Sequence, residues 1–420
     1  MQFYSTYYKK LASYEQIKQI GDKFDVLDAN KDTALNKDEM ANIFAGQTLT
    51  QEEKNMFMAG IDSDDDGFIT YSEFIPTFVE FDVDQNGQIS GEEFNLAKKR
   101  IDELQKQMDI NTQYAILNNL SSTPAQKTAA QNQISLFKVQ RNIIYAEQKV
   151  MQKEILISSN ELKIQQIQDY ISQNTLLEFE QAQKLKEIET CNLAKSVLLL
   201  EKDIVVKELN LENVNLSIIT TQQQGGTQNA LDILAQQKIS KENELNISLK
   251  NLELYQKQAK IQNDESLITK FFIPEVMKEN ARIELDILYD EVQLLNQRKD
   301  LYSKVSTLSQ TRAQMMIVWN QYLQAQTEAE KEILLQQYND LNAQQLVQQK
   351  EAQISALKVE LIDKQIQLKA VLPRSTQKPF DQVKAKLEAE IANLKSQIAA
   401  LEPVSPWPIF PPDNPDGLIY

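Results

Sequence analysis

The segment DSDDDGFITYSE, residues 62–73, places five carboxylates and one glycine within twelve consecutive positions. Like charges packed this closely repel one another, so the segment is either a solvated acidic turn or a site that a cation neutralises. Aspartates occupy its first, third and fifth positions, the glycine follows at the sixth, and a glutamate closes the segment. This regular spacing favours the cation.

Calcium is a hard cation that takes six to eight oxygen ligands, which a twelve-residue loop supplies from positions 1, 3, 5, 7, 9 and 12 around a glycine at position 6. Each of these positions in the segment offers a side-chain oxygen or, at position 7, a backbone carbonyl. The predicted ligands are Asp62, Asp64, Asp66, Phe68 through its carbonyl, Thr70 and Glu73. The segment therefore predicts a Ca²⁺ site, with Mg²⁺ as the alternative occupant at rest.

The same spacing recurs at residues 82–93, and a weaker copy precedes both at residues 28–39. Each copy has helix-forming flanks and an apolar residue at its eighth position, where paired loops form a short β-bridge. The predicted ligands of the third loop are Asp82, Asp84, Asn86, Gln88 through its carbonyl, Ser90 and Glu93. Those of the first loop are Asp28, Asn30, Asp32, Ala34 through its carbonyl, Asn36 and Glu39. Three copies in succession are much harder to explain by chance than one.

Loops 62–73 and 82–93 match the pattern D-x-[DN]-x-[DN]-G-x5-E at every position, so residues 1–100 resemble the EF-hand calcium-binding superfamily. The resemblance implies a module of three helix–loop–helix hands. The first loop departs from it, because Thr33 stands where the family has glycine. A β-branched residue held at positive φ is strained by on the order of 1–3 kcal/mol. Loop 28–39 is therefore expected either to bind metal weakly or to serve only as a structural partner.

The distances between the loops predict how they pair. Eight residues, FIPTFVEF, separate the second loop from the third, so one short helix must serve both. Two hands that share a helix are not expected to face each other as an ordinary pair. We therefore expect the first loop to pair with the second. Ile89 in the third loop is then left to pair with another protomer or partner, or to dock on its own chain.

Beyond the loops the chain predicts long helices, because only 9 glycines and 11 prolines interrupt 420 residues. A break is expected where Thr123 caps a new helix that starts at Pro124. The expected helical segments are 101–221 with a break near 121–124, 227–372 with a break near 271–274, and 379–402. The fold class is therefore all-α, with the EF-hand module at residues 1–100 followed by very long coiled-coil or bundled helices.

Apolar residues step by three and four along two of these segments, as in a coiled coil. The two runs are Leu285, Leu288, Val292 and Leu295, and Leu387, Ile391, Leu394, Ile398 and Leu401. Residue counts favour one antiparallel hairpin of about 200 Å with its tip at Gly225–Gly226. Reversals at Pro124 and Pro274 give the alternative, a shorter bundle. The tail at 403–420 is rich in proline and extended, either as a free end or as a docking peptide for a partner or for the hands.

Composition narrows the function. The chain has 44 basic and 60 acidic residues, with 19 acidic against 10 basic in the first hundred, which argues against nucleic-acid binding. It has no histidine, no glycine-rich phosphate loop and no G-x-S-x-G motif, so we expect no enzyme. No stretch approaches the roughly 20 apolar residues of a membrane span. The N-terminus lacks the apolar core of a signal peptide, so a cytoplasmic location is expected.

The share of the chain given to long helices favours a structural role, because about three quarters of the residues lie in the expected helical shaft and only a quarter in the calcium module. The expectation is a calcium-binding scaffold of a cytoskeletal assembly, with a cilium as one setting, by analogy with EF-hand modules joined to coiled coils. Its partners are expected to be proteins that contact the coiled coil and the tail, in an oligomer or filament. The alternatives are a calcium sensor or adaptor that recruits a target peptide, and, less favoured, a calcium-rich lattice protein of a secretory granule.

Overall fold

The computed structural model describes residues 14–42, 50–62, 66–86, 89–270, 272–371 and 380–402. Over these residues the fold is all-α, as predicted, apart from one two-stranded sheet. The chain divides into a first unit, residues 1–226, and a second unit, residues 227–420. The predictions for the tail at 403–420 lie outside the described residues.

The calcium module opens the first unit. Its elements are α1 (Tyr14–Leu27), β1 (Ala34–Leu35), α2 (Lys37–Ala41), α3 (Gln51–Ile61), β2 (Ile69–Thr70) and α4 (Tyr71–Phe81). Strands β1 and β2 pair antiparallel, with Leu35 opposite Ile69, so the expected pairing of the first loop with the second is confirmed. Helix α4 leaves the second loop and enters the third, which is the shared helix that the short spacing predicted.

A single aromatic-rich core holds the module together. Its buried members are Phe24, Leu35, Met40, Phe57, Met58, Ile61, Ile69, Phe74, Phe78, Phe81, Ile89, Phe94 and Ala97. Ile89 belongs to this core, so the third loop docks on its own chain, which is one of the two outcomes that the spacing left open. Burying this apolar surface is the main stabilising term for so small a module.

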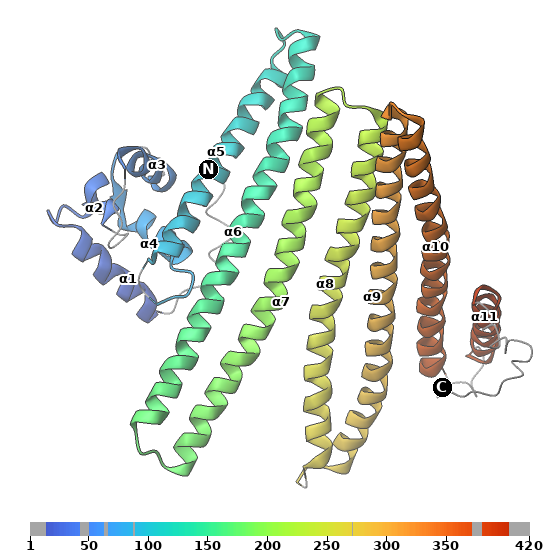
Figure 1. Cartoon of the computed structure of the whole chain (residues 1–420). Coiled ribbons are helices and arrows are strands. Elements are labelled where there is room, and N and C mark those ends of the chain that lie inside the picture. Colours follow the sequence, from blue (N-terminus) through green and yellow to red (C-terminus); the bar gives the residue numbers. More distant parts are fainter. Residues whose placement is uncertain are drawn as a thin grey trace, which may run out of the picture. The chain divides into compact units, whose positions relative to one another are not determined.

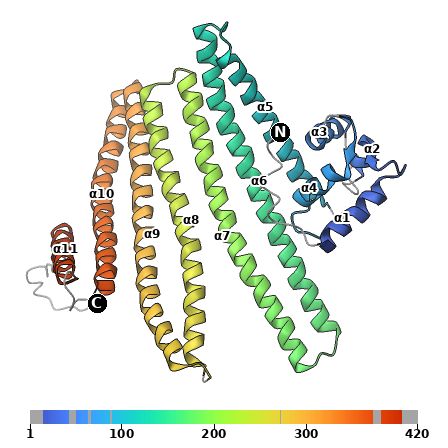
Figure 2. The same ribbon diagram turned by 180° about the vertical axis from the view of Figure 1, so that it is seen from behind.

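Three longer helices complete the first unit and lie side by side in chain order in Figure 1 and Figure 2. They are α5 (Gly91–Asn118), α6 (Pro124–Gln173) and α7 (Glu178–Gln223). Ion pairs between α6 and α7 fix an antiparallel register, because the partner number falls along α7 as the number rises along α6. These pairs are Lys149–Glu208, Lys153–Glu201, Glu154–Lys202 and Glu161–Lys195. Each contributes little stability at the surface, but together they select one register.

The predicted start of α6 is confirmed. The Thr123 hydroxyl accepts the Gln126 backbone N–H at 3.2 Å, and the Gln126 side chain accepts the Thr123 backbone N–H at 2.8 Å. The expected continuous helix to residue 221 is wrong, because the chain breaks at 174–177 without proline or glycine. There the Asn174 side chain donates to the Tyr170 carbonyl at 2.8 Å. Such local bonds from short polar side chains compete with the helix.

The second unit also consists of helices that pack in chain order, and both views show them adjacent (Figure 1, Figure 2). They are α8 (Gln228–Thr269), α9 (Glu275–Gln324), α10 (Glu328–Val371) and α11 (Phe380–Leu401). The stepped apolar runs lie in their interfaces, since Leu285, Leu288 and Leu295 on α9 are buried. On α11 the buried positions are Leu387, Ile391, Leu394 and Ile398.

A break between α9 and α10 at 325–327 was not predicted. The Thr327 hydroxyl accepts the Glu330 backbone N–H at 3.2 Å, and the Glu330 carboxylate accepts the Thr327 backbone N–H at 3.2 Å. This reciprocal pair is a capping box, which starts a new helix.

The single 200 Å hairpin is therefore wrong. The chain reverses at 119–123 and 174–177 in the first unit, and at 270–274 and 325–327 in the second. The longest helices have 50 residues, which is about 75 Å at 1.5 Å per residue. Among the described residues no helix is both long and apolar enough to cross a bilayer.

Candidate metal centre

The third loop brings three carboxylates together. Oxygen atoms of Asp82, Asp84 and Glu93 all lie within 4.8 Å of one another. Asp82 is buried, and Glu93 has no exposed surface at all. Burying a carboxylate costs several kcal/mol unless hydrogen bonds and a cation compensate. This donor set, made only of oxygen, suits a hard cation such as Ca²⁺.

Helix α5 positions Glu93, because this residue occupies the third position of the helix and Ser90 caps it. One carboxylate oxygen of Glu93 accepts the Ser90 backbone N–H at 2.8 Å. The other accepts the Val83 backbone N–H, also at 2.8 Å. The glutamate is thus stretched across the loop with its position fixed by both ends of the loop. None of the ion pairs between described residues involves Glu93.

The opposite wall of the third loop is held by its own amides. The Asn86 backbone N–H donates to Asp82 Oδ1 at 3.0 Å and to Asp84 Oδ1 at 3.1 Å. The Asn86 side chain also donates to Asp84 Oδ2 at 3.0 Å. These bonds turn the three side chains toward the inside of the loop. Gln88, the predicted carbonyl ligand, lies outside the described residues.

The second loop repeats this arrangement. Asp62 accepts the backbone N–H groups of Asp66 at 3.2 Å and of Gly67 at 2.8 Å. Gly67 has φ of 88°, a conformation that only glycine adopts without strain. Glu73 is buried and accepts both the backbone N–H and the hydroxyl of Thr70, at 2.9 and 2.8 Å. Asp64 lies outside the described residues, and the Phe68 side chain is exposed as expected for a carbonyl ligand.

The first loop has similar hydrogen bonds, but a threonine stands at its sixth position in place of glycine. Asp28 accepts the backbone N–H groups of Asp32 and Thr33 at 3.2 and 2.9 Å. Glu39 accepts those of Asn36 and Ala29 at 3.0 and 3.1 Å. Thr33 is nevertheless held at φ of 70°, as its place in the pattern predicted. The strain therefore resides in this loop, while its carboxylates still point inward.

All three loops bury the carboxylates at their first and last positions. These residues are Asp28, Glu39, Asp62, Glu73, Asp82 and Glu93. The remaining predicted side-chain ligands that the structure describes are partly buried or exposed, and they are Asn30, Asp32, Asn36, Asp66, Thr70, Asp84, Asn86 and Ser90. The Ala34 backbone lies in β1. The predicted ligand assignment stays a prediction for each loop.

Sequence analysis missed the amides at the second position of the loops. The N–H groups of Ala29 and Val83 hold the final glutamate in the first and third loops. The residue type at this position carries no signal, because any residue except proline supplies the amide. The fourth position was also missed, although Lys31 and Gln85 share φ values of 59° and 58° there. The two loops thus follow one backbone path.

Comparison with known proteins supports the third loop. A family model described as EF hand matches residues 75–96, which cover the end of α4, the third loop and the start of α5. No curated protein and no solved structure matches the chain. The match therefore supports the EF-hand superfamily at this hand and leaves the long helices without a relative.

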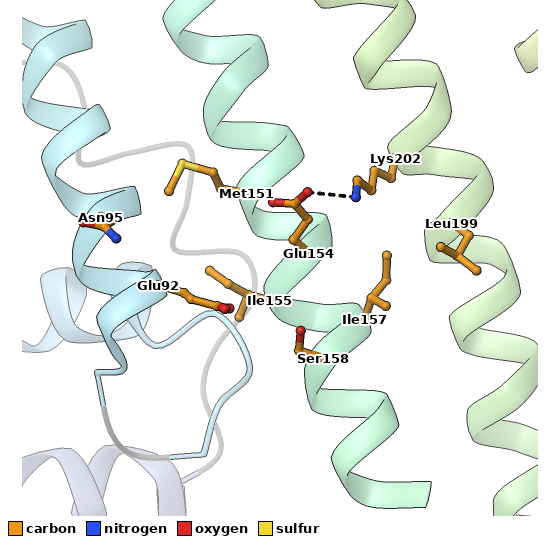
Figure 3. A pocket seen from close by; sticks show the side chains of 9 residues that line it. All are labelled: Glu92, Asn95, Met151, Glu154, Ile155, Ile157, Ser158, Leu199 and Lys202. Carbon is orange, nitrogen blue, oxygen red and sulfur yellow. Dashed lines mark ion pairs between the residues drawn. The ribbon is translucent and has the colours of Figure 1, made fainter.

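A groove of about 400 Å³ lies on the first unit where α5, α6 and α7 meet, beside the third loop. Figure 3 shows Glu92 and Asn95 reaching toward Met151 and Ile155, with the rest of the lining on α6 and α7. The remaining lining residues are Glu154, Ile157, Ser158, Leu199 and Lys202. Because Glu92 is the direct neighbour of Glu93, one wall of this groove belongs to the same helical turn as the candidate metal centre.

Proposed function

We propose that this protein binds Ca²⁺ in its second and third loops and carries a helical scaffold. The observation that carries the calcium proposal is the cluster of Asp82, Asp84 and Glu93, with oxygens within 4.8 Å of one another. Bound calcium supplies the positive charge that this cluster needs, since two of its three carboxylates, Asp82 and Glu93, are buried. In this proposal the first loop serves mainly to pair with the second through β1 and β2.

The calcium proposal is tested by calorimetric titration of the full chain with Ca²⁺. Glu93→Gln removes one charge from the third loop, and binding at that loop is expected to be lost or weakened tenfold or more, about 1.4 kcal/mol. Glu92→Gln is the matched control, because Glu92 is the exposed neighbour on the same helix. Equal Ca²⁺ affinity in the wild type and in Glu93→Gln would reject the site. A second titration with Mg²⁺ gives the Mg²⁺ affinity, and comparing the two affinities tells which ion occupies the site at rest.

The scaffold proposal assigns the long helices a mechanical role in a cytoskeletal assembly, with a cilium as one setting. The relative length of the regions supports it, because the helices α5 to α11 make up most of the described residues. The candidate metal centre lies in the short region that precedes them and at the start of α5. The proposal includes protein partners, an oligomer or filament, and no catalytic step. Calcium then stabilises the module or changes how it meets a partner.

Negative-stain electron microscopy of the purified protein, with calcium and with chelator, tests the scaffold role. Assemblies or contacts between particles that change with calcium are expected. Co-sedimentation with microtubules and with actin filaments then identifies the filament class. Failure to bind either, together with particles that stay single in both conditions, would contradict the scaffold role and leave the calcium proposal intact.

The groove beside the third loop favours a second candidate, a calcium sensor or adaptor that recruits a target. Its lining combines the apolar side chains of Met151, Ile155 and Leu199 with the ion pair between Glu154 and Lys202 at 2.8 Å. A lining of apolar side chains with a charged pair suits an amphipathic peptide.

Methyl NMR tests this second candidate. The Met151 methyl resonance is expected to shift when calcium is added to the wild type, but not to Glu93→Gln. Met315 on α9 is the matched control, because it is buried in the second unit and outside the groove. If the Met151 resonance did not shift when calcium is added, the groove would not respond to calcium and the sensor candidate would be rejected.

A further inference from the structure

One apolar face of α10 is partly buried along one half of the helix and exposed to solvent along the other. Val347, Ile354, Leu361 and Leu368 follow one another at intervals of seven, so they lie on the same face of the helix. Ile354, Leu361 and Leu368 are half-buried. Val347, the next position along this stripe, is 58% exposed, and its neighbour Leu346 is 61% exposed.

Helix α11 is the element that covers this stripe. Lys358 and Lys364, which flank the stripe, form ion pairs at 2.7 and 2.8 Å with Glu402, directly after α11, and with Glu390 on α11. The pairing is antiparallel, because the α11 numbers fall as the α10 numbers rise. The opposite side of α10 faces α9, where the Ser355 hydroxyl accepts from the Gln297 side chain at 2.9 Å.

The cover stops because α11 ends. Its last residue is Leu401, and Pro403, Pro406 and Pro408 prevent the helix from continuing. Figure 1 and Figure 2 both show α11 beside only the half of α10 that leads to Val371. In the part of the chain that the structure describes, no element covers Leu346 and Val347 on this side.

The chain that follows α11 has the right direction, length and chemistry to continue the cover. Residues 403–412, PVSPWPIFPP, carry no charge, contain five prolines and start beside Lys358. A proline-rich strand rises about 3.1 Å per residue, so the five residues from Glu402 to Trp407 can span about 16 Å. That distance equals roughly ten helical residues at 1.5 Å each, which leads from Lys358 to Leu346 and Val347.

We propose that residues 403–412 dock as an extended strand along the bare stripe of α10, with Trp407 on Leu346 and Val347. Ile409 and Phe410 then reach the turn of α10 around Ala343. The segment continues the apolar seam of α11, and its prolines limit the entropy lost on docking. The occupant is thus the protein's own tail rather than a separate partner.

Tryptophan fluorescence of the full chain tests this proposal. The chain has two tryptophans, and Trp319→Phe leaves Trp407 as the only one. Phenylalanine at position 319 still offers an aromatic ring to Tyr322 and Tyr338, which the Trp319 ring contacts. The expected result is a blue-shifted Trp407 emission that acrylamide quenches less than it quenches the free 403–412 peptide. This protection is expected at all protein concentrations.

Val347→Lys, added to Trp319→Phe, is expected to abolish the protection and to return quenching to the level of the free peptide. Ile283→Lys is the matched control, because Ile283 is 55% exposed on α9 and its substitution is expected to change nothing. Circular dichroism confirms that each variant keeps its helices. Peptide-like quenching in Trp319→Phe itself, or protection that survives Val347→Lys, would overturn the proposal. Protection that disappears on dilution would overturn it too, because the tail would then bind a second copy.

Discussion

The calcium module and the second unit solve the problem of buried polar groups differently. The module buries six carboxylates next to an aromatic core, with backbone amides as their main visible partners. The buried polar groups of the second unit are mostly neutral, with Asp264 on α8 as a buried carboxylate among them. At one buried contact the hydroxyls of Ser240 on α8 and Ser306 on α9 lie 2.8 Å apart and Gln310 donates to Ser240 at 3.0 Å. In the proposed function the module therefore needs a cation from solution, whereas the hydroxyl and amide groups of this buried contact satisfy one another without one.

This difference separates two kinds of stability. A ligand that binds only the folded state adds stability, roughly 2.7 kcal/mol at a hundredfold excess over the dissociation constant. Calcium is expected to add it to the module and not to α8 through α11. Hydrogen exchange resolves the two regions within one chain, so it is the measurement that compares them directly.

The largest expected effect comes from the shared helix α4. Phe78 is buried in the module core and packs on Phe74 with ring centroids 5.6 Å apart. Phe78→Ala is expected to cost about 3–5 kcal/mol through lost burial and a cavity. Because α4 serves two loops, calcium binding should weaken in both at once. Hydrogen exchange should quicken in the module and stay unchanged in α8 and α9.

Val26→Ala is the control for Phe78→Ala, since Val26 lies largely exposed on α1 and should tolerate the change. Faster exchange in α8 and α9 after Phe78→Ala would break the comparison, because it would show that the two regions unfold together.

The next effect concerns calcium affinity. Glu73→Gln removes charge from the last position of the second loop but keeps an oxygen for the Thr70 bonds. Binding at this loop is expected to weaken tenfold or more, about 1.4 kcal/mol. Calorimetry measures the loss, and Glu80→Gln on the exposed end of α4 is the matched control. An unchanged affinity would show that Glu73 is not a ligand.

These features differ in how far the sequence predicts them. The spacing of carboxylates predicted the loops, their pairing and the shared helix, because ligand geometry and sequence position are tightly linked. The helix start at Thr123 was predicted because a capping threonine followed by proline is a strong local signal. The breaks at 174–177 and 325–327 were not, since the search relied on proline and glycine. The Thr327–Glu330 capping box was visible in the sequence, whereas an asparagine such as Asn174 occurs both inside helices and at their ends and so gives only a weak signal.

The amides that hold the final glutamates, and the neutral bonds of the second unit, were beyond prediction for a further reason. A backbone amide has no signature in the sequence. The contact between Ser240 and Ser306 joins residues on two helices whose register depends on packing along their whole length. Stepped leucines predict that a helix has a seam, but they do not say which hydroxyl meets which across it.

A smaller effect is expected at the strained position of the first loop. Thr33→Gly relieves a strain of about 1–3 kcal/mol at φ of 70° and costs about 0.5–1 kcal/mol in chain entropy. The module is therefore expected to gain roughly 1 kcal/mol in stability, measured by urea unfolding followed by hydrogen exchange. Thr33→Ala is the matched control, because alanine keeps the strain. If both variants were equally stable, backbone strain would not distinguish this loop from the other two.

The smallest effect concerns Asp300, a carboxylate of the second unit that is paired within that unit. Burial raises the pKa of Asp300 on α9, but hydrogen bonds from Lys304 and Ser355, at 2.7 and 2.6 Å, outweigh it and hold this pKa below the ordinary value near 3.8. A lowered pKa adds stability that is complete above the unfolded-state pKa and is lost as the pH falls through the folded-state pKa. The group is partly exposed, so solvent screening limits the contribution to about 0.2–1 kcal/mol.

Urea unfolding of wild type and Asp300→Asn, from pH 7 down to pH 3, measures this contribution. The wild type is expected to be more stable at neutral pH, and the difference should shrink below about pH 4. Asp286→Asn on the same helix is the control, because Asp286 is exposed and outside the ion pairs of the described residues. The difference should also be the same with calcium and with chelator. A dependence on calcium would mean that the charge balance of the second unit is coupled to the module, and the contrast between the two regions would fail.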